Sequence, residues 1–199
     1  DYLNGQKNAL TDNAKKGMEL FFGKANCSTC HSGKLFTDQN FYALALPHFG
    51  PGRTRRFDPY ARDVGRMGES DYLEDAYRFR TPSLRNVTLT APYGHNGAYK
   101  TLSEIVKHHL DPINMHYKWN PSLVNLPSVK WLEEIDFVSF SDKYERKRII
   151  SKIDIKPINL SENEVKNIVE FLKSLTGKSL NNRPIGIPDE VPSGLTVDK

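Results

Sequence analysis

The stretch Cys27-Ser28-Thr29-Cys30-His31-Ser32-Gly33 contains both cysteines of the 199-residue chain, followed directly by a histidine. Two thiols three positions apart, with His after the second, are the attachment pattern of a c-type haem. The thiols would bond to the two vinyl groups of the haem, and His31 would take one axial position on the iron. The stretch therefore predicts one covalently bound haem c, held by Cys27, Cys30 and His31.

Three other roles for this stretch have less support. A disulfide between Cys27 and Cys30 would close a very short loop and gain little chain entropy. A thioredoxin-like redox pair is expected within a βαβ pattern, which the flanking sequence lacks. A structural zinc site needs a second close pair of ligands, and the sequence contains no further cysteine.

The composition suits a small domain built around a large apolar group. The length fits one domain, and hydrophobic residues make up only 38% of it. A porphyrin would add an apolar surface on which the core side chains can pack. The net charge of +4 is mild and is more typical of an ordinary solvated surface than of a docking face for an acidic partner.

The hydropathy and the start of the chain bear on its location. No stretch of 18 apolar residues occurs, so we expect no membrane span. No signal peptide is visible at Asp1-Tyr2-Leu3-Asn4. Because haem is attached to this motif outside the cytoplasm, we expect a periplasmic or otherwise extracytoplasmic protein that has lost its leader, or a fragment of a longer chain.

Three segments have the periodicity and the end signals of helices. They are residues 11–22, 101–111 and 161–177. Thr11 can cap the first, and the other two begin with capping boxes that pair Thr101 with Glu104 and Ser161 with Glu164. Pro112 stops the second helix.

The glycine inside the first of these helices indicates how the helices pack. Gly17 weakens a helix, so its presence predicts the close approach of another helix. A helix before the haem motif and a last helix with a matching apolar face make the usual small cytochrome c arrangement, in which the two cross beside the haem. The predicted fold class is mainly α: a cytochrome c-type fold with a single covalent haem, extended loops and a long insertion.

We expect residues 1–199 to form a single cytochrome c-like domain. Its core covers about residues 8–110 and 157–177, an insertion covers 111–156, and an extended tail covers 178–199.

The irregular segments carry weaker predictions. The stretch 35–57 is aromatic and rich in Pro and Gly, which favours a loop that wraps a ligand. Pro82 and Pro92 limit any strand to residues 84–89. The insertion is expected to hold one short helix near 141–150. It also carries Trp119 and Trp131, which would bind a partner or pack over the haem edge.

A small basic cluster precedes the middle of the chain, at Arg53, Arg55 and Arg56. A nucleic-acid partner is not indicated, because no basic helix or aromatic stacking platform accompanies it. Arginines that pair with haem propionates, or that face solvent, are the more ordinary explanations.

The sixth position on the iron decides between open-site chemistry and electron transfer. His109 shares a helix face with Leu102 and Ile105 and so points to the core. His108 lies about 100° away and is expected to face outward. Met115 follows Pro112 in a loop from which a methionine can also reach iron. The full set of candidates is His48, Met67, His95, His108, His109, Met115 and His116.

Two longer stretches resemble one known family. They are Phe79-Arg80-Thr81-Pro82-Ser83-Leu84-Arg85-Asn86-Val87 and Thr90-Ala91-Pro92-Tyr93-Gly94-His95-Asn96-Gly97. Both resemble the bacterial dihaem cytochrome c peroxidase and MauG-like family, and further motifs match it in the same order. These are Phe36-Thr37-Asp38, Asp63-Val64-Gly65-Arg66, Thr101-Leu102-Ser103-Glu104 and Phe171-Leu172-Lys173-Ser174-Leu175-Thr176-Gly177. The resemblance covers about residues 12–110 and 157–177.

The resemblance implies how the chain would work. Members of that family normally have two cytochrome c domains, a peroxidatic N-terminal one and a C-terminal one that receives electrons or stores oxidising equivalents. This chain resembles the C-terminal haem domain only. The expected function is therefore electron transfer to or from a partner haem. The alternatives are one half of an active peroxidase or MauG-like oxidising enzyme, whose peroxidatic haem is on another chain or segment, and a structural subunit with an incidental haem.

The resemblance also implies roles for single residues. The distal ligand is methionine in the peroxidases and tyrosine in the MauG branch, and its position falls on His109. Bis-histidine ligation would give a lower potential than a His/Met centre. The matching arginines, Arg80 and Arg66, are expected near the haem, and the backbone carbonyls of Thr90 and Pro92 would contribute to a calcium site between two domains.

Two expectations on the surroundings of the site complete the set. His95 is expected beside the haem pocket without binding iron. The partner would be a redox protein or a second haem domain in a homo- or hetero-oligomer.

Overall fold

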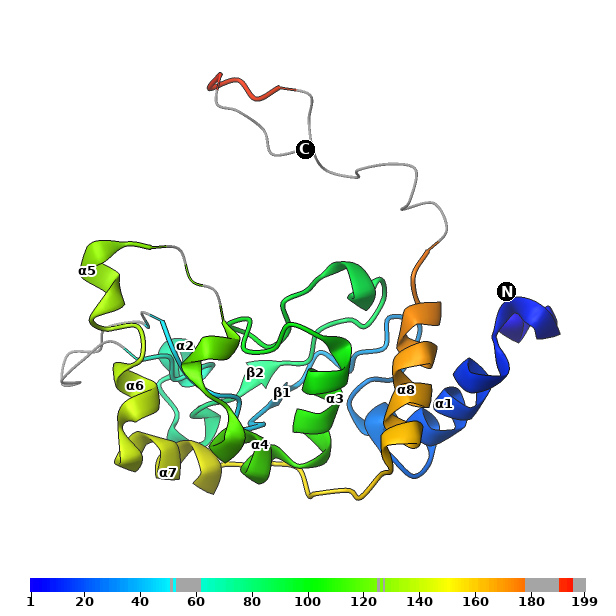
Figure 1. The fold of residues 1–199 in the computed structure, drawn as a ribbon, viewed down its shortest axis with the longest axis horizontal. Coiled ribbons are helices and arrows are strands. Elements are labelled where there is room, and N and C mark those ends of the chain that lie inside the picture. Colours follow the sequence, from blue (N-terminus) through cyan, green and yellow to red (C-terminus); the bar gives the residue numbers. More distant parts are fainter. Residues whose placement is uncertain (51, 53–61, 125, 127, 178–189, 195–199) are drawn as a thin grey trace.

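The computed structural model describes residues 1–50, 52, 62–124, 126, 128–177 and 190–194. Over these residues the chain is mainly helical, with a small two-stranded sheet near the centre (Figure 1). The α-helices are α1 Asp12–Phe22, α2 Met67–Ser70, α3 Leu102–Leu110, α4 Pro112–Lys118, α5 Lys130–Glu133, α6 Val138–Ser141, α7 Lys143–Ser151 and α8 Glu162–Ser174. Single 3₁₀ turns lie at Tyr2–Asn4, Lys7–Ala9, Cys27–Thr29, Leu73–Asp75, Val87–Leu89 and Pro121–Leu123.

The three helices predicted from periodicity are confirmed, together with their start signals. The hydroxyl of Thr11 accepts from the backbone N–H of Ala14 at the start of α1. Both predicted capping boxes are formed, at the first turns of α3 and α8. The last helix ends at Ser174, three residues before Gly177, whose N–H instead donates to the side chain of Asn86.

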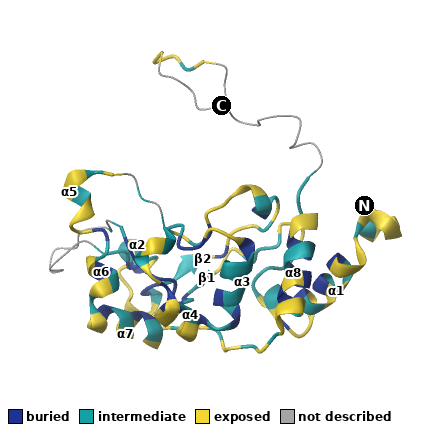
Figure 2. Cartoon of the chain, viewed as in Figure 1, coloured by how far each residue is buried: buried dark blue, intermediate teal, exposed yellow. Residues whose placement is uncertain are grey.

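The first and last helices cross at a glycine, as predicted. α1 packs against α8 (Figure 1). A Cβ atom on Gly17 would lie 1.8 Å from the backbone oxygen of Asn167, so only glycine permits this approach. The rings of Phe21 and Phe171 meet beside the crossing, with centroids 5.2 Å apart. Figure 2 shows buried positions on both helices where they face each other.

The strand predictions need a correction. No strand forms within residues 84–89, where the structure has the 3₁₀ turn Val87–Leu89, preceded by Asn86 in a left-handed conformation with φ 60°. Such a backbone cannot continue an extended strand. Strand pairing occurs earlier, where β1 (Phe41–Tyr42) runs antiparallel to β2 (Phe79–Arg80), with Phe41 opposite Arg80.

The segment 111–156 is more helical than predicted. It contains α4, α5, α6 and α7 rather than one short helix. Pro112 does end α3, but it also occupies the first turn of α4, because proline needs no hydrogen-bond acceptor there. Met115 therefore lies in a helix and not in a loop. Trp119 is only 4% exposed, whereas Trp131 is 74% exposed, so only the second fits the predicted surface aromatic.

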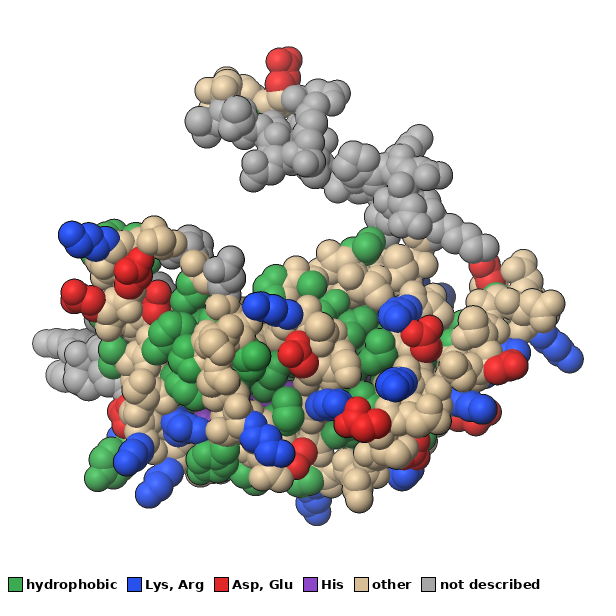
Figure 3. Space-filling view, viewed as in Figure 1, with side chains coloured by type: hydrophobic (Ala, Val, Ile, Leu, Met, Phe, Trp, Pro, Cys, Tyr) green, Lys and Arg blue, Asp and Glu red, His purple; other side chains and the backbone are tan. Residues whose placement is uncertain are grey.

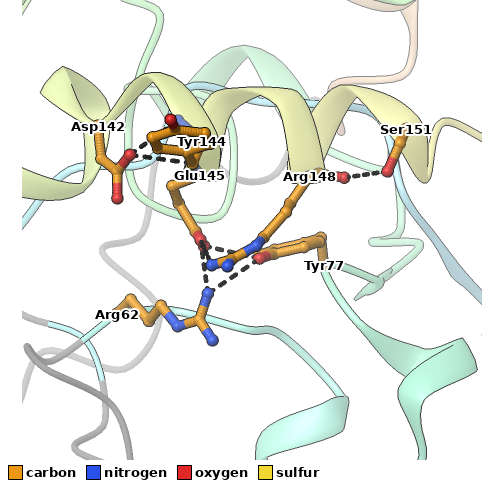
Figure 4. A network of polar contacts seen from close by, with 7 residues as sticks. All are labelled: Arg62, Tyr77, Asp142, Tyr144, Glu145, Arg148 and Ser151. Carbon is orange, nitrogen blue, oxygen red and sulfur yellow. Dashed lines mark hydrogen bonds and ion pairs between the residues drawn. The ribbon is translucent and has the colours of Figure 1, made fainter.

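A buried carboxylate links segment 111–156 to the rest of the chain. Glu145 of α7 is fully buried and accepts hydrogen bonds from the Tyr77 hydroxyl at 2.7 Å and from Arg62 at 2.5 Å (Figure 4). Arg148, one turn further along α7, is 3.2 Å from the same carboxylate. Pairing of this kind is what makes a buried charge tolerable.

The apolar core forms two clusters. The larger one joins α1, α3 and α8 to Trp119, and the smaller one joins Met67 and Tyr77 to Ile149 of α7. Figure 3 shows hydrophobic side chains near the centre of one face, with Lys, Arg, Asp and Glu mixed around them. Among the described helices, none has the length and apolar character needed to cross a membrane.

Two sequence predictions fall on residues that the structure does not describe. They concern the basic cluster of Arg53, Arg55 and Arg56 and most of the extended tail 178–199.

Candidate functional site

The cysteine motif begins a few residues after the end of α1 and is preceded by a left-handed residue. Asn26 has φ 55° and starts the 3₁₀ turn Cys27–Thr29. The backbone N–H of His31 then donates to the carbonyl of Cys27 at 3.0 Å, which closes the turn of the motif. Both cysteines are free thiols and partly buried. Burial raises the pKa of the Cys27 thiol to about 11.

His31 is held by a backbone carbonyl at one edge of its ring. Its Nδ1 lies 3.1 Å from the carbonyl oxygen of Phe36. Because a carbonyl can only accept, Nδ1 donates to Phe36, and the Pro82 carbonyl also lies near the ring. Burial, and then the nearby His109, lower the pKa of His31 to about 4. The ring is therefore neutral at pH 7 and can act as a metal ligand through Nε2.

His109 repeats the same arrangement on α3. Its Nδ1 lies 2.8 Å from the carbonyl oxygen of Ile105, one turn earlier in the helix. Nδ1 again must donate, which leaves the Nε2 lone pair for a ligand. Burial lowers the pKa of His109 below its usual value, so this ring is also neutral at pH 7.

The two imidazole rings lie at a distance that fits one metal ion between them. The ring centroids of His31 and His109 are 6.4 Å apart, and the ring planes are tilted by 56°. Two nitrogen–metal bonds of about 2 Å, with about 1 Å from each ring centre to its nitrogen, give about 6 Å for a shared metal. Two neutral rings at this spacing, beside two free thiols, suit a covalently attached haem with histidine on both faces.

Two other histidine candidates are engaged by the protein through both ring nitrogens. His108 is fully buried, with Nδ1 2.8 Å from the Tyr99 hydroxyl and Nε2 2.7 Å from the carbonyl of Leu44. His116 is also fully buried, with Nδ1 2.8 Å from the carbonyl of Ala45. Its Nε2 accepts from Arg146 at 3.3 Å. The prediction that His108 faces outward was wrong, because a second layer of chain covers that side of α3.

The remaining histidines form a group of their own. The His95 ring stacks on Phe79, with centroids 3.6 Å apart and planes 9° apart. The buried His48 ring lies 5.2 Å from that of His95, and its Nδ1 has no hydrogen-bond partner among the described residues. Burial lowers the pKa of both rings to about 3. Met67, another candidate, is buried in the smaller apolar cluster.

The two predicted arginines make protein contacts. The Arg66 guanidinium lies 4.3 Å above the Phe41 ring, and its Nε donates to Asp75 at 2.9 Å. Arg80 is exposed and donates to the side chain of Gln39 at 2.5 Å.

The predicted calcium carbonyls lie on an exposed loop. Thr90 follows the 3₁₀ turn Val87–Leu89, and its hydroxyl donates to the carbonyl of Val87 at 3.0 Å. Pro92 is joined to Ala91 by a cis peptide bond. Thr90 and Pro92 are both exposed.

Sequence reasoning missed Tyr42 and Tyr99, which both lie next to candidate haem-binding residues. The Tyr42 hydroxyl donates to Asp38 at 2.7 Å and also contacts the thiol of Cys30. Asp38 raises the pKa of Tyr42 to about 12. Tyr99 donates to His108, the neighbour of His109. Neither position carries a sequence signal, because each contact joins residues whose proximity depends on the fold.

Buried neutral histidines predict acid sensitivity. Burial lowers the pKa of His116 to about 4 and that of His48 to about 3 in the folded state, against about 6.5 when unfolded. Below pH 6.5 the unfolded chain binds more protons than the folded chain. The free energy of unfolding therefore decreases as the pH is lowered, by up to about 1.4 kcal/mol per pH unit for each such ring. Urea unfolding of wild type and His116→Gln between pH 6.5 and 4.5 should show a shallower pH slope for the variant. Equal slopes would contradict the lowered pKa of His116 in the folded state.

Comparisons with known proteins point in one direction. No protein-family model matches the chain. Over 124 residues it is 42% identical to the cytochrome-c peroxidase IdrP1 of Pseudomonas sp. (strain SCT), covering 53% of this chain and 33% of that protein. Over 191 residues it is 31% identical to the cytochrome-c peroxidase IdrP1 of Denitromonas iodatirespirans, covering 86% of this chain and 42% of that protein.

A solved structure gives a similar result over nearly the whole chain. A MauG-like protein associated with microbial copper homeostasis matches with a TM-score of 0.60 at 26% identity, over 92% of this chain and 52% of that one. The chain spans from a third to about half of the length of these relatives.

Proposed function

Since the chain belongs to the bacterial dihaem cytochrome c peroxidase and MauG-like family, we propose that it is a c-type haem domain that passes electrons to or from a partner haem. The observation that carries the proposal is the facing pair of neutral imidazoles, His31 and His109, with centroids 6.4 Å apart. When bound, a haem supplies an iron that takes up and gives back one electron.

Each residue of the site has a part in this proposal. Cys27 and Cys30 hold the haem covalently, which keeps it in place through both oxidation states. The carbonyls of Phe36 and Ile105 accept from Nδ1 of the two histidines, so Nε2 of each ring would be the atom that binds the iron. If both histidines bound the iron, small oxidants such as peroxide would find no open position, and electron transfer would be favoured. Two nitrogen ligands also predict a lower potential than a His/Met centre.

A second candidate function is one half of an active peroxidase or MauG-like enzyme. It is favoured by the relatives, which are cytochrome-c peroxidases, and by the fraction of their length that this chain spans, 42% in one case. In that case the present site would relay electrons to a peroxidatic haem on another chain or segment.

The same proposal includes surroundings that the family implies. A redox protein or second haem domain would be the partner, in a homo- or hetero-oligomer. A calcium ion would bind the backbone carbonyls of Thr90 and Pro92, which suit it as oxygen ligands and lie on an exposed loop. The location would be periplasmic or otherwise extracytoplasmic, since haem attachment takes place there.

Intact-mass measurement and spectroscopy test the proposal together. Protein produced with the c-type haem attachment machinery should be heavier than the bare chain by one haem, roughly 616 Da. The double variant Cys27→Ser, Cys30→Ser should lack this addition. The wild-type ferric spectrum should be low spin and unchanged by peroxide. A chain without added mass overturns the haem assignment, and a high-spin ferric spectrum that changes rapidly with peroxide overturns electron transfer in favour of an enzyme.

A further inference from the structure

His108 is the residue directly before the candidate ligand His109, and its side chain is among the most enclosed in the chain. It is fully buried, and both of its ring nitrogens make short hydrogen bonds. The carbonyl of Leu44 can only accept, so Nε2 carries the proton and donates to it at 2.7 Å. Nδ1 then accepts from the Tyr99 hydroxyl at 2.8 Å. The imidazole therefore links α3 to two other segments at once.

Both segments that His108 contacts are themselves held in place. Leu44 follows Ala43, whose N–H donates to the Asp154 carboxylate at 2.8 Å and whose carbonyl accepts from the Asp154 N–H at 2.9 Å. Tyr99 pairs with Tyr93 through two backbone hydrogen bonds, of 2.7 and 3.1 Å, and is only 2% exposed. His108 is thus fixed between two anchored points that do not belong to its own helix.

This arrangement determines how α3 is rotated about its axis. Successive residues of an α-helix are separated by about 100° around the axis and 1.5 Å along it. A helix that is held at His108 therefore has the direction of His109 fixed as well. If α3 rotated to bring His109 away from His31, the buried His108 would lose one or both hydrogen bonds, and an unpaired buried polar group costs about 1–3 kcal/mol.

We propose that His108 is a positioning residue, and that the relay from Tyr99 through His108 to Leu44 sets the distance and the 56° tilt between the His31 and His109 rings. The inference rests on the proposed function, in which these two rings bind the haem iron. The relay makes no contact with the iron and acts only through the backbone of α3.

The angle between the axial imidazole planes has its own spectroscopic signature. In a ferric low-spin haem with two histidine ligands, this angle sets the splitting of the iron d orbitals and with it the g values of the electron paramagnetic resonance (EPR) spectrum. His108→Phe keeps a ring of similar size but makes neither hydrogen bond. We expect the largest g value of the variant to shift, and a high-spin fraction to appear.

His116 offers a matched control. It is equally buried and donates at 2.8 Å to the carbonyl of Ala45, the residue after Leu44. It does so from α4, which carries neither His31 nor His109. His116→Phe should therefore destabilise the fold by a comparable amount in urea unfolding while leaving the g values and the spin state as in wild type. Tyr99→Phe, which loses one hydroxyl group, should shift the g values in the same direction as His108→Phe, by less.

The outcomes separate the possible conclusions. A g-value shift in His108→Phe and Tyr99→Phe, without a shift in His116→Phe, supports the inference. Unchanged g values in Tyr99→Phe and His108→Phe, or equal shifts in all three variants, overturn it and leave the proposed function intact. If His108→Phe fails to fold, the comparison of the g values of Tyr99→Phe with those of His116→Phe decides the question. A wild-type protein without a low-spin bis-histidine signal overturns the proposed function, and this inference with it.

Discussion

Replacing His109 by alanine should convert the ferric haem protein from low spin to high spin. The imidazole of His109 is the ring that faces His31 at 6.4 Å, and its removal leaves one axial position to water or to no ligand. The variant should also react with small ligands such as cyanide or peroxide that the wild type excludes. The absorption spectrum and EPR of the purified ferric protein measure both effects directly.

Two further variants make this test specific. Met115→Leu, which removes an alternative candidate ligand in α4, should leave the low-spin spectrum unchanged. His109→Met replaces nitrogen by a thioether and should raise the reduction potential above that of wild type, since a His/Met centre has the higher potential. A His109→Ala protein that keeps the wild-type low-spin spectrum would remove His109 from the site.

Gly17→Ala should destabilise the protein strongly although it improves the local helix. Alanine is better than glycine in a helix by about 1 kcal/mol. The added Cβ, however, would lie 1.8 Å from the backbone oxygen of Asn167 and 2.4 Å from its carbonyl carbon. A backbone atom cannot turn aside as a side chain can, so α1 and α8 must separate. Overpacking of this kind costs about 1–3 kcal/mol or more, and we expect a net loss of about 2 kcal/mol in urea unfolding.

Gly68→Ala is the matched control for this substitution. Gly68 also lies in a helix, α2, but its nearest neighbour for an added Cβ is the end of the Val64 side chain at 3.8 Å. This is ordinary contact, so stability should change little or rise by a few tenths of a kcal/mol. Equal effects at both glycines would show that the α1–α8 crossing is looser than the structure has it.

The predictions that succeeded from sequence rest on local chemistry. The helix starts at Thr11, Thr101 and Ser161 were predictable because each cap is a contact within four residues. The close crossing at Gly17 was predictable because glycine destabilises a helix interior, so its presence there indicates that another segment approaches too closely for a side chain.

The predictions that failed depend on contacts between distant residues. His108 was expected to face outward because helix periodicity describes one apolar face, whereas α3 is covered on a second side by the chain at Leu44. The buried Glu145 lies in a run of mixed charges that looks solvated in the sequence. Only the fold brings Arg62 and Tyr77, 83 and 68 residues away, to its carboxylate.

The sequence by itself predicted the haem-attachment motif at Cys27, Cys30 and His31, because covalent attachment requires those residue types at that spacing. It also determined which segments form the main helices, since caps and periodicity act over a few residues. Only the tertiary structure decided which imidazole faces His31. Besides His31 the chain contains five histidines, and which of them lies opposite His31 depends on how α3 is turned. That rotation is set by hydrogen bonds from Tyr99 and to Leu44, which lie 9 and 64 residues from His108.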